Sequence, residues 1–139
     1  MSAAARGAAR AAPHLFDDFV PGCALGDATC TYDEAMAAGW RRIFGAHQPA
    51  GVEAAGVALA LTMRGYLSVV APRPPGNVHA SQRLQLSALP RPGEQVRTLV
   101  TCAGKEIRRE RRYVEIDVSA TGTGQRPLFA GRLTLVWAA

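Results

Sequence analysis

A long apolar segment near the middle of the chain is the strongest hydrophobic pattern in the sequence. It runs from Gly51 to Ala71, and its markedly polar residues are Glu53, Thr62, Arg64 and Ser68. Ala, Leu and Met favour helices, and the segment is long enough for about five helical turns. The pattern therefore predicts one buried helix over residues 51–71. Two charges interrupt the segment, so we do not expect it to span a membrane.

Most of the sequence after this segment alternates between apolar and polar residues with a period of two, which is typical of half-buried strands. The strands are predicted over residues 78–86, 96–102, 113–120 and 128–137. The charged run KEIRRERR at residues 105–112 is predicted to be two strand ends that meet at a hairpin, and GTGQ at residues 122–125 is predicted to be another hairpin turn. The second half of the chain is thus expected to form about four antiparallel strands.

The sequence before the central segment predicts a strand and a short helix. Small and β-branched residues favour a strand over residues 23–32, and EAMAAGWRRIFG then has the spacing of an amphipathic helix that ends at Gly45. Thr31 and Glu34 have the spacing of a capping box, which predicts Thr31 as the N-cap. Residues 1–13 are expected to be a flexible tail, and residues 14–139 a single domain.

Composition and charge fit an ordinary globular chain. Its 139 residues are 48% hydrophobic and 19% charged, and the formal net charge is +5. Lys105 is the only lysine, so arginine dominates the positive charge. Arginine suits phosphate and carboxylate groups, so the charge indicates either a solvated basic surface or an anionic ligand. No basic stripe interleaved with aromatic residues is present, so nucleic acid is not an expected partner.

The cysteines indicate a reducing compartment. Cys23, Cys30 and Cys102 are odd in number and have no paired spacing, which argues against a disulfide framework and against a zinc site. The amino-terminal residues lack the apolar core of a secretory signal. We therefore expect a cytoplasmic protein with reduced thiols, no metal and no redox cofactor.

The predicted order is strand, short helix, long helix and four antiparallel strands, which gives an α+β fold with one sheet wrapped around a central helix. With FDDFVPG, YDEAMAAGWRRIFG, LPRPGEQVRTLV and the closing hairpin, residues 15–139 resemble a MaoC-like hot-dog domain. The resemblance implies dimerisation by pairing of sheets, with the same chain or with another hot-dog subunit. It also implies binding of acyl thioesters of coenzyme A or acyl carrier protein, with no separate cofactor.

In active hydratases of this family, an Asp and a His in a Gly-Asp-x-Asn-Pro-x-His-x-Asp motif carry the chemistry. The matching stretch here is GAHQPAGVE, residues 45–53, which keeps the Gly and the Pro. Gln48 stands for the Asn and Glu53 for the last Asp. Ala46 falls at the position of the catalytic Asp and Gly51 at that of the His, and neither side chain can move a proton. The resemblance therefore implies loss of the usual catalytic pair.

Nearby residues are candidates for a substituted site. His47 and Glu53 are the candidate acid and base, and Gln48, Gly51 and Gly56 are the candidate substrate-binding residues. Each also has a purely structural explanation. A histidine in a Pro-containing loop is commonly solvated, and a glutamate in a first helical turn is favoured by the helix dipole.

Three functions therefore remain open. The sequence fits a binding protein for acyl thioesters, or the non-catalytic partner of a hydratase subunit. It also fits an active hydratase or dehydratase that uses His47 and Glu53, or a thioesterase that uses Glu53. The arginines at residues 108–112 either decorate a solvated hairpin or hold cofactor phosphates, if that hairpin borders the acyl site.

Overall fold

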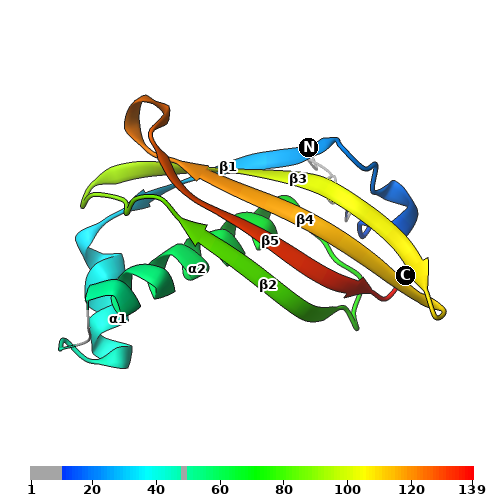
Figure 1. Cartoon of the computed structure of the whole chain (residues 1–139), viewed down its shortest axis with the longest axis horizontal. Helices are drawn as coiled ribbons and strands as arrows, with labels where there is room; N and C mark the ends of the chain where they lie inside the picture. Colours follow the sequence, from blue (N-terminus) through cyan, green and yellow to red (C-terminus); the bar gives the residue numbers. More distant parts are fainter. Residues whose placement is uncertain (1–10, 48–49) are drawn as a thin grey trace, which may run out of the picture.

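The computed structural model describes residues 11–47 and 50–139, which form a five-stranded antiparallel sheet with a long helix against one face (Figure 1). The elements in chain order are η1 (Phe16–Asp18), β1 (Ala24–Tyr32), α1 (Glu34–Phe44), α2 (Ala50–Val69), β2 (Val78–Leu86), β3 (Glu94–Arg108), β4 (Arg111–Thr121), η2 (Thr123–Gln125) and β5 (Pro127–Trp137). The predicted α+β class is confirmed. Most of the predicted tail, residues 1–10, lies outside the described residues.

The strands are ordered β1-β3-β4-β5-β2, so β1 and β2 are the two edges of the sheet. The alternation predicted for the central strands is confirmed: in β4, buried Val114, Ile116 and Val118 alternate with residues that face outward. Strand β2 differs from the prediction of a half-buried strand, because it is exposed at nearly every position. It pairs only with β5, so its second edge has no strand beside it among the described residues.

Helix α2 matches the predicted central helix, but it is buried on one side only. Ala58, Leu61 and Tyr66 are among the residues that face the sheet, whereas Val52 and Leu67 are exposed. The apolar composition all around the helix had predicted complete burial. Of the helices that the structure describes, none combines the length and the apolarity that crossing a bilayer would require.

The short helix α1 begins differently from the prediction. The predicted N-cap, Thr31, is part of β1, where it pairs with Gln95. Asp33 is the N-cap, and its carboxylate accepts a hydrogen bond of 2.9 Å from the backbone N–H of Met36. The predicted end at Gly45 is confirmed, since Gly45 is the C-cap with a φ of 94°. Asp is as favourable as Thr at an N-cap, and Thr31 is unavailable here because it is part of strand β1.

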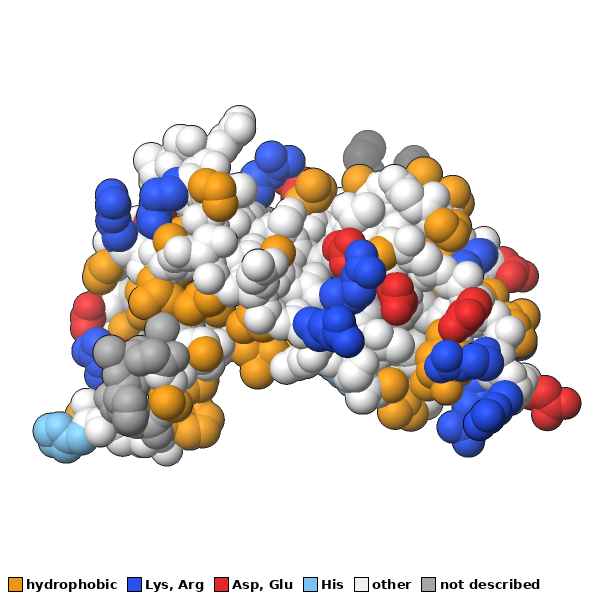
Figure 2. All heavy atoms as spheres, in the orientation of Figure 1, with side chains coloured by type: hydrophobic (Ala, Val, Ile, Leu, Met, Phe, Trp, Pro, Cys, Tyr) orange, Lys and Arg blue, Asp and Glu red, His pale blue; other side chains and the backbone are white. Residues whose placement is uncertain are grey.

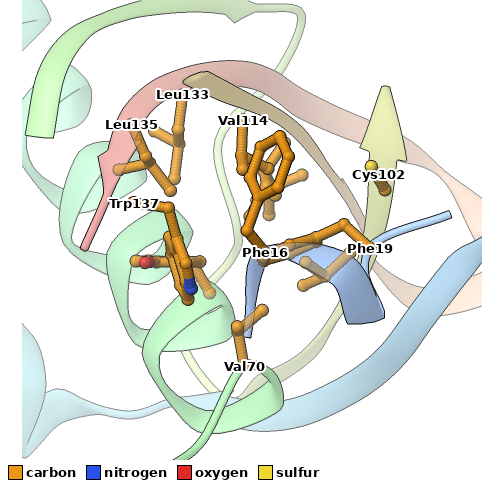
Figure 3. Packing of buried hydrophobic residues seen from close by; sticks show 12 residues of the cluster. Phe16, Phe19, Val70, Cys102, Val114, Leu133, Leu135 and Trp137 are labelled. Atoms are coloured by element: carbon orange, nitrogen blue, oxygen red, sulfur yellow. The ribbon is translucent and has the colours of Figure 1, made fainter. Parts of the chain in front are cut away.

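The larger part of the core lies between the carboxyl half of α2 and the sheet (Figure 3). The segment before β1 closes this end of the core with Phe16 and Phe19. Phe19 packs edge-on against Trp137, with ring centroids 4.9 Å apart, and the Trp137 indole donates a hydrogen bond to the carbonyl of His14. Phe16 and Phe19 are thus both core residues.

At the opposite end of the sheet, hydrogen bonds of one carboxylate join the loop before β3 to the loop after β4. The carboxylate of Glu94 is buried and accepts hydrogen bonds from the backbone N–H groups of Arg91 and Thr123, each at 2.9 Å. It also forms an ion pair with Arg126. The two backbone N–H groups, with a further contribution from Arg126, lower the pKa of Glu94 from 4.5 to about 2.

The contact between α2 and β3 leaves no room for a side chain at Gly65. A Cβ atom there would lie 2.5 Å from Thr98 Oγ1, inside van der Waals contact. We expect Gly65→Ala to lower the free energy of unfolding by about 2 kcal/mol in urea denaturation, because the helix must move off the sheet. Gly39→Ala is the matched control, since its Cβ meets only the end of Arg42 at 3.9 Å. Equal stability of both variants would contradict this close approach.

Glu94 should also give the protein a defined acid sensitivity. Its pKa is lower in the folded chain than in the unfolded chain, so its stabilising effect is complete above pH 4.5 and is lost as the pH falls toward about 2. We expect Glu94→Gln to be less stable at pH 7 and to lose part of this acid dependence, as measured by thermal unfolding between pH 2 and 7. An unchanged slope in that range would show that Glu94 is not held as described.

Candidate functional site

A pocket of about 240 Å³ lies between α2 and the strands β1 and β3. Its lining consists of Ala28, Thr29 and Cys30 from β1, Leu61, Arg64, Gly65 and Ser68 from α2, and Val96 and Thr98 from β3. The four helical residues have the spacing i, i+3, i+4, i+7, so they share one face of α2. Because Gly65 has no side chain, the helix can lie close to β3. The small residues Ala28 and Ser68 leave space for the pocket beside this contact.

The pocket has an apolar floor and a polar rim. Leu61 and Val96 are buried and form the floor, while Arg64 and Ser68 are exposed at the surface. An Nη1 atom of Arg64 donates a hydrogen bond to the sulfur of Cys30 at a distance of 3.4 Å. An apolar cavity with a few convergent polar groups is the usual form of a small-molecule site.

A larger groove, of about 580 Å³, crosses the opposite face of the sheet. Two of its charged groups are paired with each other, since Arg132 forms two hydrogen bonds with Asp117, at 2.7 and 2.9 Å. Figure 2 shows this pattern more widely, with positive and negative side chains side by side over the strands. Because the inner pocket has the apolar floor and lies against the central helix, we take it as the candidate site.

The structure does not bring the two predicted catalytic residues together. His47 lies in the exposed turn after α1, whereas Glu53 lies in the first turn of α2 and forms an ion pair with Arg41 of α1 at 3.2 Å. No hydrogen bond or ion pair joins His47 to Glu53 among the described residues. Neither residue lines the pocket. Their use as an acid and base stays a prediction.

Glu53 sits in a small polar cluster at the amino end of α2. Its side chain is 21% exposed, and that of Arg41 is 48% exposed, so this ion pair is partly screened by water. Burial, and then the charge of Glu53, raises the pKa of the Tyr32 phenol above 10.0. Tyr32 therefore stays protonated at neutral pH, as a neutral neighbour of the ion pair.

Of the predicted substrate-binding residues, Gly51 and Gly56 do not line the pocket. Gln48 is outside the described residues, and Gly51 falls in the first turn of α2. Gly56 is covered by the ring of Trp40, which a Cβ atom at this position would overlap. Gly56 thus lets α1 pack closely against α2. A substrate contact for any of the three stays a prediction.

The sequence analysis missed the residues that line the pocket. One signal was present, because Arg64 and Ser68 are polar, four residues apart and therefore on one face of an otherwise apolar helix. Cys30 and Val96 are paired across β1 and β3, and so are Ala28 and Thr98, but this register cannot be read from the sequence. The hairpin arginines proposed as phosphate ligands do not line this pocket.

The described residues contain no cluster of three or more His, Cys, Asp or Glu side chains that would hold a metal ion. Nor does a carboxylate or an imidazole line the pocket within that part of the chain. The chemistry available at the pocket is thus apolar contact, hydroxyl hydrogen bonding, one guanidinium and one thiol. This set suits binding better than proton transfer.

A single antiparallel sheet wrapped around one long helix defines the hot-dog class. The MaoC-like dehydratase from Rhodospirillum rubrum has this fold and matches with a TM-score of 0.69 at 16% identity, over 91% of this chain and 98% of that chain. The R-hydratase PhaJ1 from Pseudomonas aeruginosa, in its unliganded form, matches with a TM-score of 0.68 at 14% identity, over 88% and 84%.

The ChsH1-ChsH2 complex from Mycobacterium tuberculosis matches with a TM-score of 0.64 at 14% identity, over 86% of this chain and 98% of that chain. No protein-family model and no curated protein matches the sequence. The structural matches establish that the chain has the hot-dog fold of MaoC-like dehydratases and R-hydratases. The fold implied by the resemblance is confirmed.

The three thiols should differ in reactivity. Cys23 is exposed, Cys30 is half-buried at the pocket and Cys102 is buried. Burial raises the pKa of the Cys102 thiol, which further reduces its reactive form. We expect an aromatic disulfide reagent to modify two thiols in the native protein and the third only in denaturant. Modification of Cys102 in the native protein, shown by peptide mapping, would contradict the packing described.

Proposed function

We propose that this chain binds acyl thioesters, with the acyl group in the pocket between α2 and β1, and that it lacks the hydration chemistry of active hydratases. The observation that carries the proposal is the apolar pocket against the central helix of a hot-dog fold. Leu61 and Val96 would receive the acyl chain, and burial of apolar surface would drive binding at roughly 25 cal/mol per Å².

The residues at the usual catalytic positions support binding without hydration. Adding water to a 2-enoyl thioester requires one group that takes a proton from water and another that delivers a proton to carbon. Ala46 and Gly51 occupy the positions where the resemblance places these groups. Glu53, the nearest carboxylate in sequence, is engaged by Arg41.

The exposed edge of the sheet supports a second hot-dog subunit as partner. In the described part of the chain, strand β2 pairs only with β5, and it exposes Val78 and Leu86. An unpaired edge of this kind is a template for another strand. The fold neighbours include the HadBC and ChsH1-ChsH2 complexes. We propose that a second subunit, either a copy of this chain or an active hydratase chain, pairs here. The three free cysteines support a cytoplasmic location.

One observation favours the alternative, an active hydratase or thioesterase that uses Glu53. This carboxylate is the least exposed partner of its ion pair and lies close enough to Tyr32 to affect its pKa. If substrate displaced Arg41, Glu53 would act as a base toward water. The first experiment must therefore measure binding and turnover separately.

We expect the purified chain to bind butyryl-CoA in calorimetry and to leave the enone absorbance of crotonyl-CoA unchanged. Ser68→Phe should abolish binding, because a ring at this exposed rim position fills the pocket without entering the core. Leu67→Phe, one residue away and outside the pocket lining, is the matched control and should bind normally.

The variants Glu53→Gln and His47→Ala distinguish the alternatives. Both should bind butyryl-CoA as tightly as the unmodified chain, because neither residue lines the pocket. Turnover of crotonyl-CoA that collapses in either variant would instead support the enzyme. Absence of binding by the unmodified chain would refute the proposed function.

A further inference from the structure

One cation at the pocket has no anionic partner among the described residues. Arg64 lies on the face of α2 that lines the pocket, and its only hydrogen bond within residues 11–47 and 50–139 is to the thiol of Cys30. Sulfur is a weak acceptor, whereas a guanidinium carries five donors and prefers a carboxylate or phosphate. The guanidinium of Arg64, the strongest hydrogen-bond donor at the site, therefore has only a weak acceptor among the described residues.

Two other arginines of the sheet have a carboxylate as partner. Arg97 of β3 forms an ion pair with Asp27 of β1 at 2.8 Å, and Arg132 of β5 forms one with Asp117 of β4 at 2.7 Å. Among the described residues, no carboxylate forms an ion pair with Arg64. The carboxylate nearest along β1, Asp27, is already bound to Arg97.

The surroundings of Arg64 limit what an anionic ligand would look like. Thr29 and Ser68 bring hydroxyl groups to the same lining, and Leu61 and Val96 form the apolar floor beneath. The volume of about 240 Å³ is below that of typical sites for drug-sized ligands, which begin at roughly 300 Å³. The pocket thus suits a short chain of methylene groups that ends in an anion.

We propose that the pocket selects acyl groups that themselves end in a carboxylate, that is, monothioesters of short dicarboxylic acids. The methylene groups would pack on Leu61 and Val96, and the terminal carboxylate would replace the Cys30 thiol as the partner of Arg64. The planar fork of a guanidinium matches a carboxylate with two hydrogen bonds. This inference rests on the proposed binding of acyl thioesters and specifies their class.

The test compares two thioesters of equal carbon number, glutaryl-CoA and pentanoyl-CoA, by calorimetry with the full chain. The coenzyme is common to both, so the ratio of their dissociation constants reports only the terminal group. We expect glutaryl-CoA to bind about fivefold tighter, as for an exposed ion pair, and Arg64→Gln to reduce the ratio to one or below.

Arg83→Gln is the matched control. Arg83 lies on β2, does not line this pocket and forms no ion pair with a described residue, so the variant loses the same charge elsewhere. The ratio should be unchanged in Arg83→Gln. A second measurement locates the ligand: in Cys23→Ser protein, glutaryl-CoA should protect Cys30 from alkylation by iodoacetamide.

The outcomes separate the two proposals. Equal affinity for both thioesters, or an Arg64→Gln variant that weakens both alike, would refute selection for a terminal carboxylate while leaving thioester binding intact. In the second case Arg64 would contact the coenzyme itself. Failure of the unmodified chain to bind either thioester would refute the proposed function and this inference with it.

Discussion

The packing of α2 against the concave face of the sheet is the contact on which the rest of the structure depends. Both hydrophobic clusters include residues of this helix: Tyr66 belongs to the larger one, and Val57, Ala58 and Leu61 to the smaller. The approach is close at Gly65, where a Cβ atom would meet Thr98 of β3. A side chain at this position would separate the two layers and loosen both clusters at once.

The same approach creates the pocket. Where α2 lies close to β3, the adjacent edge strand β1 contributes the small residues Ala28, Thr29 and Cys30 to the space beside the helix, and the pocket results. The fold thus produces a cavity with a buried apolar floor and a rim open to water. The contacts that stabilise the fold thus also form the proposed acyl site, which lies against the helix rather than at the loop before it.

This location differs from the site that the resemblance implied. The motif placed the chemistry at residues 45–53, at the amino end of α2, and the structure shows there an ion pair between Glu53 and Arg41 and a tight contact between Gly56 and Trp40. These two contacts explain Glu53 and Gly56 as structural residues, and neither explanation requires a bound ligand. The pocket instead lies more than two turns further along the helix, beginning at Leu61.

The elements were largely predictable from the sequence because their signals are local. The apolar run at residues 51–71, the alternation in β4 and the turn near Arg109 each depend on neighbouring residues only. The predicted N-cap, Thr31, was wrong because β1 extends through this residue, and Asp33 caps α1 instead. That outcome depends on strand pairing, which local sequence does not specify.

The pocket was not predictable for the same reason. Its residues come from three elements, and their meeting depends on the register of β1 against β3 and on the rotation of α2 about its axis. The exposure of β2 was not predictable either, since its sequence alternates like that of a half-buried strand. Its exposure depends on its place at the edge of the sheet, which the local sequence does not specify. The analogous alternation in β4 was confirmed because its inner side chains, Val114, Ile116 and Val118, pack in the core cluster that includes Tyr66 of α2.

The most direct test of this account is a crystal structure of the chain with butyryl-CoA. The account predicts that the acyl chain lies between α2 and β1, in contact with Leu61 and Val96, and that Glu53 keeps its ion pair with Arg41. An acyl chain at the amino end of α2, beside Glu53 and away from Leu61, would contradict it. The candidate site would then be the one that the motif at residues 45–53 implies.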